Sequence, residues 1–487
     1  MTIERMPMEW GLRSGAAVAA VVALFGGYLV ADAYDVVPGM LTTAEPWPEA
    51  APFPTAPGAV EGPAPAALLE GLPDDAPVPD SVEVQRLVSD LARDKRLGSR
   101  VGVTVADAAT GQVLGSSNPD RLMTPASTQK LFTGVAALLA SPADRTLDTR
   151  AVLADDDTVV LVGGGDMMLA AGHGDPDAVN GRAGLADLAQ QVAAKVKITG
   201  RTQVRVALDD TLFTGDDIAP TVASPDIAAG YIAPVASLGV NVGLLSDEYS
   251  DNGPRASDPG KYAAEAFAAA LEEEGLETAG AVVDQTAPDG ARVLGEVSSA
   301  PLGEVVGFAM QYSDNTITEV LGRLVAVAQG LPGSNDGATQ AVISTARRLG
   351  IDMTGARLRD CSGLGDGSYL SAEQLTDLLT VMVDPARPEL RSEAVGMPVA
   401  GLNGTLADSH GRFTGDNPAR GLARAKTGSL PQVRALAGTV LTADDRLLVF
   451  SVLADAIPAD RSVGATWIYD DFVGRLATYS AVAPQGG

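Results

Sequence analysis

The chain has 487 residues, of which 46% are hydrophobic, so it is long enough to bury more than one compact core. Its 62 acidic and 34 basic residues give a formal net charge of −28, which repels phosphate backbones and argues against nucleic-acid binding. The single cysteine, Cys361, excludes an intramolecular disulfide, and two histidines are too few for the usual zinc-hydrolase ligand set. We therefore expect neither a metal nor another cofactor.

The N-terminal segment, residues 1–33, contains an uncharged and mostly apolar run at 14–30. Arg5 and Arg13 precede this run and Asp32 follows it, which predicts a cytoplasmic N-terminus and an extracytoplasmic body. The run is just long enough to span a membrane, and the sequence Ala-Asp-Ala at 31–33 fits a signal-peptidase site. A cleaved signal and a membrane anchor both remain open, and either one places the protein in the cell envelope.

Residues 34–80 are dense in proline and alanine and predict a semi-extended linker. Beyond it, apolar spacing predicts a helix at 82–96, and a turn at 109–111 predicts a hairpin between 101–105 and 113–115. Strands near both ends with helices between them predict an α/β (α+β) body whose sheet is mainly antiparallel and flanked by helices. Further helices are predicted at 128–140, 261–274, 316–328, 339–349, 372–383 and 460–476, and paired strands at 433–441 and 446–454.

The first motif that carries chemistry is Ser-Thr-Gln-Lys at 127–130, which follows Pro125 at a predicted helix start. Spacing of three places Ser127 and Lys130 side by side. A serine hydroxyl needs a base to become a nucleophile, and a lysine of lowered pKa can be that base. Only six of the 34 basic residues are lysines, and arginine could not do this work. Alone, the motif fits a surface helix with an exposed lysine equally well.

Two further motifs follow along the chain. Ser313 and Asn315 belong to a Ser-Asp-Asn tripeptide at the start of a predicted helix, where a hydroxyl could relay a proton and an amide could hold a carbonyl. The same tripeptide occurs at 250–252, but a Gly-Pro pair follows that copy and indicates a loop. Lys426, Thr427 and Gly428 lead into a predicted strand whose edge could bind an extended peptide. Alone, the second motif indicates a helix cap and the third a turn.

The order Ser-x-x-Lys, Ser-x-Asn, Lys-Thr-Gly is typical of penicillin-binding proteins and serine β-lactamases. The sequence resembles the D-alanyl-D-alanine carboxypeptidase/endopeptidase family, the low-molecular-mass class C penicillin-binding proteins, over the chain from about residue 82 to the C-terminal helix. The segments that carry this resemblance are 125–131, 164–166, 312–315, 360–364, 400–406 and 425–429.

The resemblance implies that Ser127 attacks the penultimate D-Ala carbonyl of a peptidoglycan stem peptide and that Lys130 accepts its proton. It implies that Ser313 passes a proton to the departing D-Ala while Asn315 orients the acyl amide. Lys426 and Thr427 would bind the terminal carboxylate. The backbone N–H groups of Ser127 and Ser429 would form the oxyanion hole, and β-lactam antibiotics would acylate Ser127 as covalent inhibitors. The small Gly428 would let the substrate backbone approach closely.

The family also implies a penicillin-binding-protein/β-lactamase-like transpeptidase fold with a domain inserted between the first two motifs. We expect a catalytic domain formed by residues 81–146 and 299–487 and an inserted domain at 147–298. A β-lactamase is the nearest alternative enzyme, although no second base for rapid deacylation is recognisable. A non-catalytic envelope protein that binds muropeptides on the same fold is the alternative from another class.

Overall fold

The computed structural model describes residues 28–29, 72–73, 75–155, 157–459 and 462–480. The chain divides into two units, Met1–Gly71 and Leu72–Gly487, and the first is described only at residues 28–29. The predictions for 1–33 and for most of the linker at 34–80 therefore lie outside the described residues. Within the described ranges, no helix combines the length and the apolar character needed to span a bilayer.

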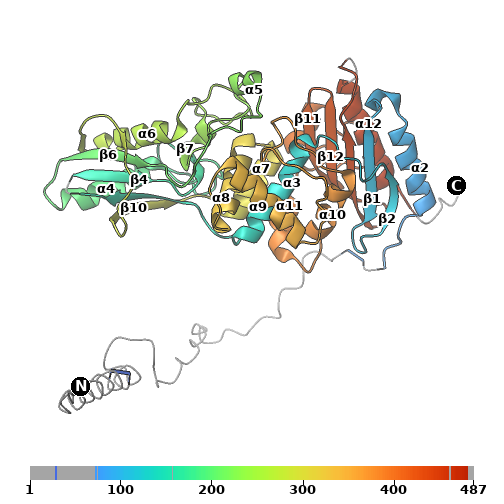
Figure 1. Ribbon diagram of the computed structural model, residues 1–487, viewed down its shortest axis with the longest axis horizontal. Helices are drawn as coiled ribbons and strands as arrows, with labels where there is room; N and C mark the ends of the chain where they lie inside the picture. The colour runs from blue at the N-terminus through green and yellow to red at the C-terminus, as the bar shows by residue number, and fades with distance from the viewer. Residues whose placement is uncertain (1–27, 30–71, 74, 156, 460–461, 481–487) are drawn as a thin grey trace, which may run out of the picture. The chain divides into compact units, whose positions relative to one another are not determined.

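A five-stranded antiparallel sheet contains strands from both the N-terminal and the C-terminal parts of the folded chain (Figure 1). The predicted hairpin at 101–115 and the predicted strand pair at 433–454 form parts of this one sheet, because β1 pairs with β13 and places Val103 opposite Val452. The prediction of a mainly antiparallel sheet is confirmed here. The strand order is β11 (Ala423–Leu430), β12 (Val433–Leu441), β13 (Leu447–Ala454), β1 (Val101–Asp107) and β2 (Val113–Ser117).

Alternating side chains of this sheet enter two separate cores. On β13, Phe450 and Val452 join the core formed with α2 (Ser81–Ala92) and α12 (Ser462–Ala477), whereas Val449 and Leu453 join the core formed with the other helices. The predicted helix at 82–96 is shorter than expected. It ends at Ala92, and a 3₁₀ turn at Lys95–Leu97 follows, because the Asp94 side chain accepts a hydrogen bond from the Arg96 N–H and starts a new turn.

The helices on the other face of the sheet include those next to the first two motifs. The predicted helices at 128–140, 316–328, 339–349 and 372–383 are confirmed, with ends shifted by a few residues, whereas α7 and α11 were not predicted. α3 packs against α7, α8 and α9, so the helix after Ser127 lies at the centre of this layer. The helices are α3 (Lys130–Ala140), α7 (Leu302–Tyr312), α8 (Asn315–Ala328), α9 (Asn335–Arg348), α10 (Ala372–Met382) and α11 (Arg391–Gly396).

A second sheet contains only strands that lie between residues 148 and 298. Its β4 and β6 are parallel, and α4 (Leu185–Lys197) and α6 (Pro259–Glu273) form a core with it, so it has a hydrophobic core of its own. These strands fall inside the range expected for the inserted domain, whose limits of 147 and 298 stay a prediction. The strands are β3 (Asp148–Leu153), β4 (Thr158–Val162), β6 (Gln203–Asp209), β8 (Glu277–Thr278), β9 (Val283–Asp284) and β10 (Arg292–Ser298). This region also contains a two-stranded sheet of β5 (Asp166–Leu169) and β7 (Leu238–Val240), the short helix α5 (Ser224–Ala228) and a 3₁₀ turn at Asn241–Gly243.

Candidate active site

Ser127 lies in a 3₁₀ turn, Ala126–Gln129, and the α-helix begins only at Lys130. We call this segment the nucleophile turn. Its Ala126 has a φ of +47°, an uncommon conformation for a residue with a side chain, and such backbone strain is frequent at functional sites. Three residues complete one turn of a 3₁₀-helix, which aligns Ser127 with Lys130. The Lys130 Nζ lies 3.2 Å from the Ser127 Oγ, so the predicted pairing of these two side chains is present.

Lys130 is fully buried, and its amine has three neighbours. Its Nζ lies 2.7 Å from the Asn315 Oδ1 and 2.7 Å from the Ser362 carbonyl oxygen, in addition to the Ser127 hydroxyl. Burial lowers the pKa of Lys130 to about 8, against the opposing effect of nearby carboxylates, chiefly that of Asp360. A substantial fraction of the amine is therefore neutral near pH 8 and able to accept a proton.

The second motif lies where one helix ends and the next begins. Ser313 ends α7 in a left-handed conformation with a φ of +57°, and the Asp314 side chain caps α8 by accepting a hydrogen bond from the Ile317 N–H. Asn315 is therefore the first residue of α8, and the cap is Asp314 rather than a serine or asparagine of the motif. The turn directs Asn315 toward Lys130, and the Asn315 Nδ2 donates to the Tyr231 carbonyl oxygen at 2.8 Å.

The third motif lies on β11. The fully buried Lys426 places its Nζ 2.7 Å from the Ser313 Oγ, and burial followed by the charge of Lys130 lowers its pKa well below the usual range. The Thr427 hydroxyl donates to the Thr405 hydroxyl at 2.9 Å. At Gly428, a Cβ atom would lie 2.8 Å from the Pro125 carbonyl oxygen, so the absent side chain leaves room for the nucleophile turn. The sequence predicted a different use for the small Gly428, namely close approach of the substrate backbone.

These motifs surround one cavity of about 660 Å³. The structure thus brings Ser127, Ser313, Asn315 and Thr427 to one cavity, with the buried amines of Lys130 and Lys426 bonded to its hydroxyls. Its walls also include Ser429, together with Tyr312, Leu364 and Thr405 from the segments that carry the family resemblance. The other residues of its walls were not singled out for the site by the sequence: Asp226, Tyr231, Asp251, His410, Arg412, Leu430, Pro431, Gln432, Arg434 and Thr466.

Sequence reasoning missed two kinds of site residue. Tyr231 contributes a backbone carbonyl, which any residue type supplies, so no residue pattern could reveal it. Glu319 and Asp360 are buried carboxyl groups that electrostatically favour the charged form of Lys130, and Asp360 already stood in one of the segments that carry the family resemblance. Among the described residues, no cluster of three or more His, Cys, Asp or Glu side chains is placed to hold a metal ion.

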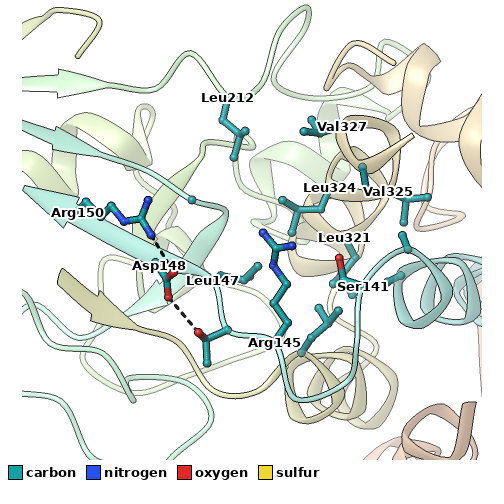
Figure 2. A pocket seen from close by; sticks show the side chains of 16 residues that line it. Ser141, Arg145, Leu147, Asp148, Arg150, Leu212, Leu321, Leu324, Val325 and Val327 are labelled. Atoms are coloured by element: carbon teal, nitrogen blue, oxygen red, sulfur yellow. Dashed lines mark hydrogen bonds and ion pairs between the residues drawn. The ribbon is translucent and has the colours of Figure 1, made fainter. Parts of the chain in front are cut away.

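A second cavity of about 290 Å³ lies toward the C-terminal ends of α3 and α8, which begin at the active site (Figure 2). Its lining is mostly aliphatic, with Leu321, Leu324 and Val325 from α8, and Arg145 and the Asp148–Arg150 ion pair are its charged groups. It contains none of the three motifs, so its chemistry is distinct from that of the active site.

An antiparallel sheet flanked by helices, with a Ser-x-x-Lys pair facing Ser-x-Asn and Lys-Thr-Gly, defines the class of penicillin-binding proteins and serine β-lactamases. Within that class, the chain belongs to the D-Ala-D-Ala carboxypeptidase 3 (S13) family, which matches residues 84–254 and 248–476. This membership confirms the family indicated by the sequence.

Characterised relatives agree with this placement. The chain is 35% identical to carboxypeptidase Rv3627c of Mycobacterium tuberculosis, over 78% of this chain and 82% of that protein. It is 34% identical to carboxypeptidase DacB of Mycolicibacterium smegmatis, over 90% of each. The fold is similar to that of penicillin binding protein 4 (dacB) from Haemophilus influenzae, with a TM-score of 0.66 and 22% identity over 80% of this chain and 98% of the other.

Proposed function

We propose that the protein is a serine D,D-peptidase that cleaves D-Ala-D-Ala termini or D-amino-acid cross-links of peptidoglycan through an acyl-enzyme on Ser127. One observation carries this proposal: the amines of Lys130 and Lys426 and the hydroxyls of Ser127 and Ser313 form two hydrogen-bonded pairs at one cavity. Membership of the S13 family supplies the substrate class, because its description names D-Ala-D-Ala carboxypeptidases.

The geometry around Lys130 supports its role as the base of acylation. A neutral amine has two N–H donors and one lone pair. The Asn315 Oδ1 and the Ser362 carbonyl oxygen, both at 2.7 Å, accept the two N–H bonds, which leaves the lone pair for the Ser127 hydroxyl. The Ser127 Oγ then attacks the carbonyl carbon of the penultimate D-Ala as its proton passes to Lys130.

Collapse of the tetrahedral intermediate requires a proton on the departing amine. Ser313 is placed to supply it, because its Oγ is 2.7 Å from the Lys426 Nζ and can be reprotonated from there. We assign the terminal carboxylate to Lys426 and Thr427, and the oxyanion to the N–H groups of Ser127 and Ser429. Water then hydrolyses the ester: its oxygen bonds the acyl carbon, the bond to the Ser127 Oγ breaks, and a proton of that water restores the Ser127 hydroxyl. Lys130 releases to solvent the proton that it accepted, and Lys426 takes up from solvent the proton that it gave.

We further propose that the enzyme acts in the cell envelope after export, with the N-terminal segment serving as signal peptide or anchor. The apolar run at 14–30 and its flanking charges support export. We also keep the division into a linker at 34–80, a catalytic domain at 81–146 and 299–487, and an inserted domain at 147–298. Separate cores for the two sheets support this division.

Mass spectrometry of the full chain after penicillin treatment tests the function. We expect one adduct, on Ser127, together with release of D-Ala from a peptide ending in D-Ala-D-Ala. Ser127→Ala abolishes both, whereas Ser89→Ala, on α2 outside the cavity, changes neither. Rapid turnover of penicillin would favour a β-lactamase instead, and muropeptide binding without adduct or product would favour a non-catalytic protein.

A further inference from the structure

The loop of residues 360–365, which we call the clamp loop, is bonded to the nucleophile turn and to α3 through three successive carbonyl oxygens. The Asp360 carbonyl accepts from the Gln129 Nε2 at 2.5 Å, and the Cys361 carbonyl accepts from the Thr133 Oγ1 at 2.8 Å. The Ser362 carbonyl accepts from the Lys130 Nζ at 2.7 Å. The side chains of Gln129, Lys130 and Thr133 therefore hold this loop in place. In return, the Ser362 carbonyl holds the amine of Lys130, the proposed base.

Two buried carboxyl groups accept hydrogen bonds from backbone N–H groups of the same loop. Glu319, from α8, accepts from the Cys361 N–H at 3.0 and 3.1 Å and from the Ser362 N–H at 2.8 Å. Asp360 accepts from the Gly363 N–H at 2.7 Å and from the Gly365 N–H at 2.6 Å. Because Glu319 binds the peptide groups on both sides of Cys361, it fixes the orientation of the backbone that leads to the Ser362 carbonyl.

The clamp loop also contacts the nucleophile turn directly. Gly363 has a φ of +76°, and a Cβ atom there would lie only 2.1 Å from the Ala126 carbonyl oxygen. No side chain fits between the two backbones. A shift of the clamp loop would therefore move the residue before Ser127 as well as the acceptor of Lys130.

We propose that Glu319 and Asp360 are positioning residues of the acylation step, which hold the Ser362 carbonyl where it takes one N–H of Lys130 and so aim the amine lone pair at the Ser127 hydroxyl. This inference rests on the proposed role of Lys130 as base. Neither carboxyl group touches the substrate or the reacting atoms. Both act through the clamp loop, and the Asp360 Oδ1 also accepts from the Gln129 Nε2 of the nucleophile turn at 3.1 Å. Neither role follows from the three motifs.

The charges of Glu319 and Asp360 affect the pH dependence of acylation, which a loss of stability alone would not change. Burial and the charge of Asp360 raise the pKa of Glu319 to about 7, so above that pH it is mainly a carboxylate. In that form it stabilises the ammonium form of Lys130, and removing it lowers the pKa of Lys130 further. Removing Glu319 should therefore shift the pH profile of acylation to lower pH. The charged or titratable groups that face Lys130 are Asp314, Glu319, Asp360, Cys361 and Lys426, and those that face Glu319 include Asp360 and Arg323.

The test uses Glu319→Gln in the full chain and follows acylation by a fluorescent penicillin from pH 6 to 10. The variant keeps the shape of the side chain but brings an amide NH₂ against the Cys361 N–H. We expect the limiting acylation rate constant to fall about tenfold or more, within the range that positioned proton transfer contributes. The inflection of the pH profile should move down by about half a unit or more, while the dissociation constant of the non-covalent penicillin complex stays within about twofold.

Glu304→Gln is the matched control, because this carboxylate on α7 is half-exposed and pairs with Arg182 outside the clamp loop. It should leave the rate constant and the inflection unchanged. If Glu319→Gln does not fold, Asp360→Asn is submitted to the same two measurements. A uniform loss of rate without a shifted inflection, or an unchanged profile, would overturn the proposal. Absence of acylation in the wild-type protein would instead overturn the proposed function.

Discussion

The buried amine of Lys130 predicts a specific pH dependence of acylation. Its pKa is lowered to about 8, chiefly because burial disfavours the charged form, and only the neutral amine can accept the Ser127 proton. With that pKa, roughly one molecule in ten has the neutral amine at pH 7 and about nine in ten at pH 9. The acylation rate constant should therefore rise about tenfold between these pH values and then level off.

An unperturbed lysine would behave differently. With a pKa near 10.5, only about 3% of its amines would be neutral at pH 9, so the rate would rise about a hundredfold between pH 7 and pH 9 without levelling off. Stopped-flow measurement with a fluorescent penicillin between pH 6 and 10 distinguishes the two cases. A flat profile, or a hundredfold rise without a plateau, would refute the assignment of Lys130 as a base of lowered pKa.

Two lysine variants control this measurement. Lys130→Arg should abolish acylation at every pH in the range, because a guanidinium group does not give up its proton there. Lys195→Arg, on α4, should leave the profile unchanged, because the Lys195 amine lies at the surface and donates to the Val293 carbonyl oxygen.

Three further predictions concern stability and the clamp loop. Gly363→Ala should lower the free energy of unfolding by about 2–5 kcal/mol and slow penicillin labelling, because the cost of its Cβ overlapping the nucleophile turn adds to that of the left-handed backbone. Gly350→Ala, which has a similar left-handed φ of +87° but open space, should cost about 1–2 kcal/mol and leave labelling unchanged, and urea unfolding checks both. Arg446→Met should cost about 3–5 kcal/mol in the same assay, because it leaves the fully buried Asp107 carboxylate without its ion pair; a loss below 1 kcal/mol would contradict this. Burial raises the pKa of Asp166 to about 7, so between about pH 4 and 7 the folded state keeps a proton on this carboxyl group that the unfolded state has lost. The free energy of unfolding should therefore fall as pH rises through that range. Asp166→Asn should reduce this fall, and an unaltered slope would contradict the assignment.

The sequence predicts the parts of the site that depend on local geometry. Ser127 and Lys130 are three positions apart, and any helical turn brings them together, so their pairing was predictable even though the turn is 3₁₀. The helices with regular apolar spacing were predicted for the same reason. The catalytic sheet was predictable because its two strand pairs carry strong apolar runs at the two ends of the chain.

The remaining features depend on contacts that leave no residue pattern. The strands of the second sheet were not predicted, because β4 is almost fully buried and lacks the alternation that identifies a half-buried strand. The support of Asn315 by the Tyr231 carbonyl and the bonds from Glu319 to the clamp loop both involve backbone groups. Such contacts depend on tertiary structure, which a single sequence does not encode in a recognisable motif.

The pairing of β1 with β13 constrains the order in which the enzyme can form during synthesis. Val101 and Ala454 are direct neighbours in the sheet, and β11, which bears Lys426, is joined to β1 through β12 and β13. Contacts between residues so distant in sequence form late and slowly. During synthesis from the N-terminus, Ser127 is translated long before Lys426. A truncated or half-translated product therefore has a Ser127 that is not yet active, and hydrolysis begins only when the last strands have formed.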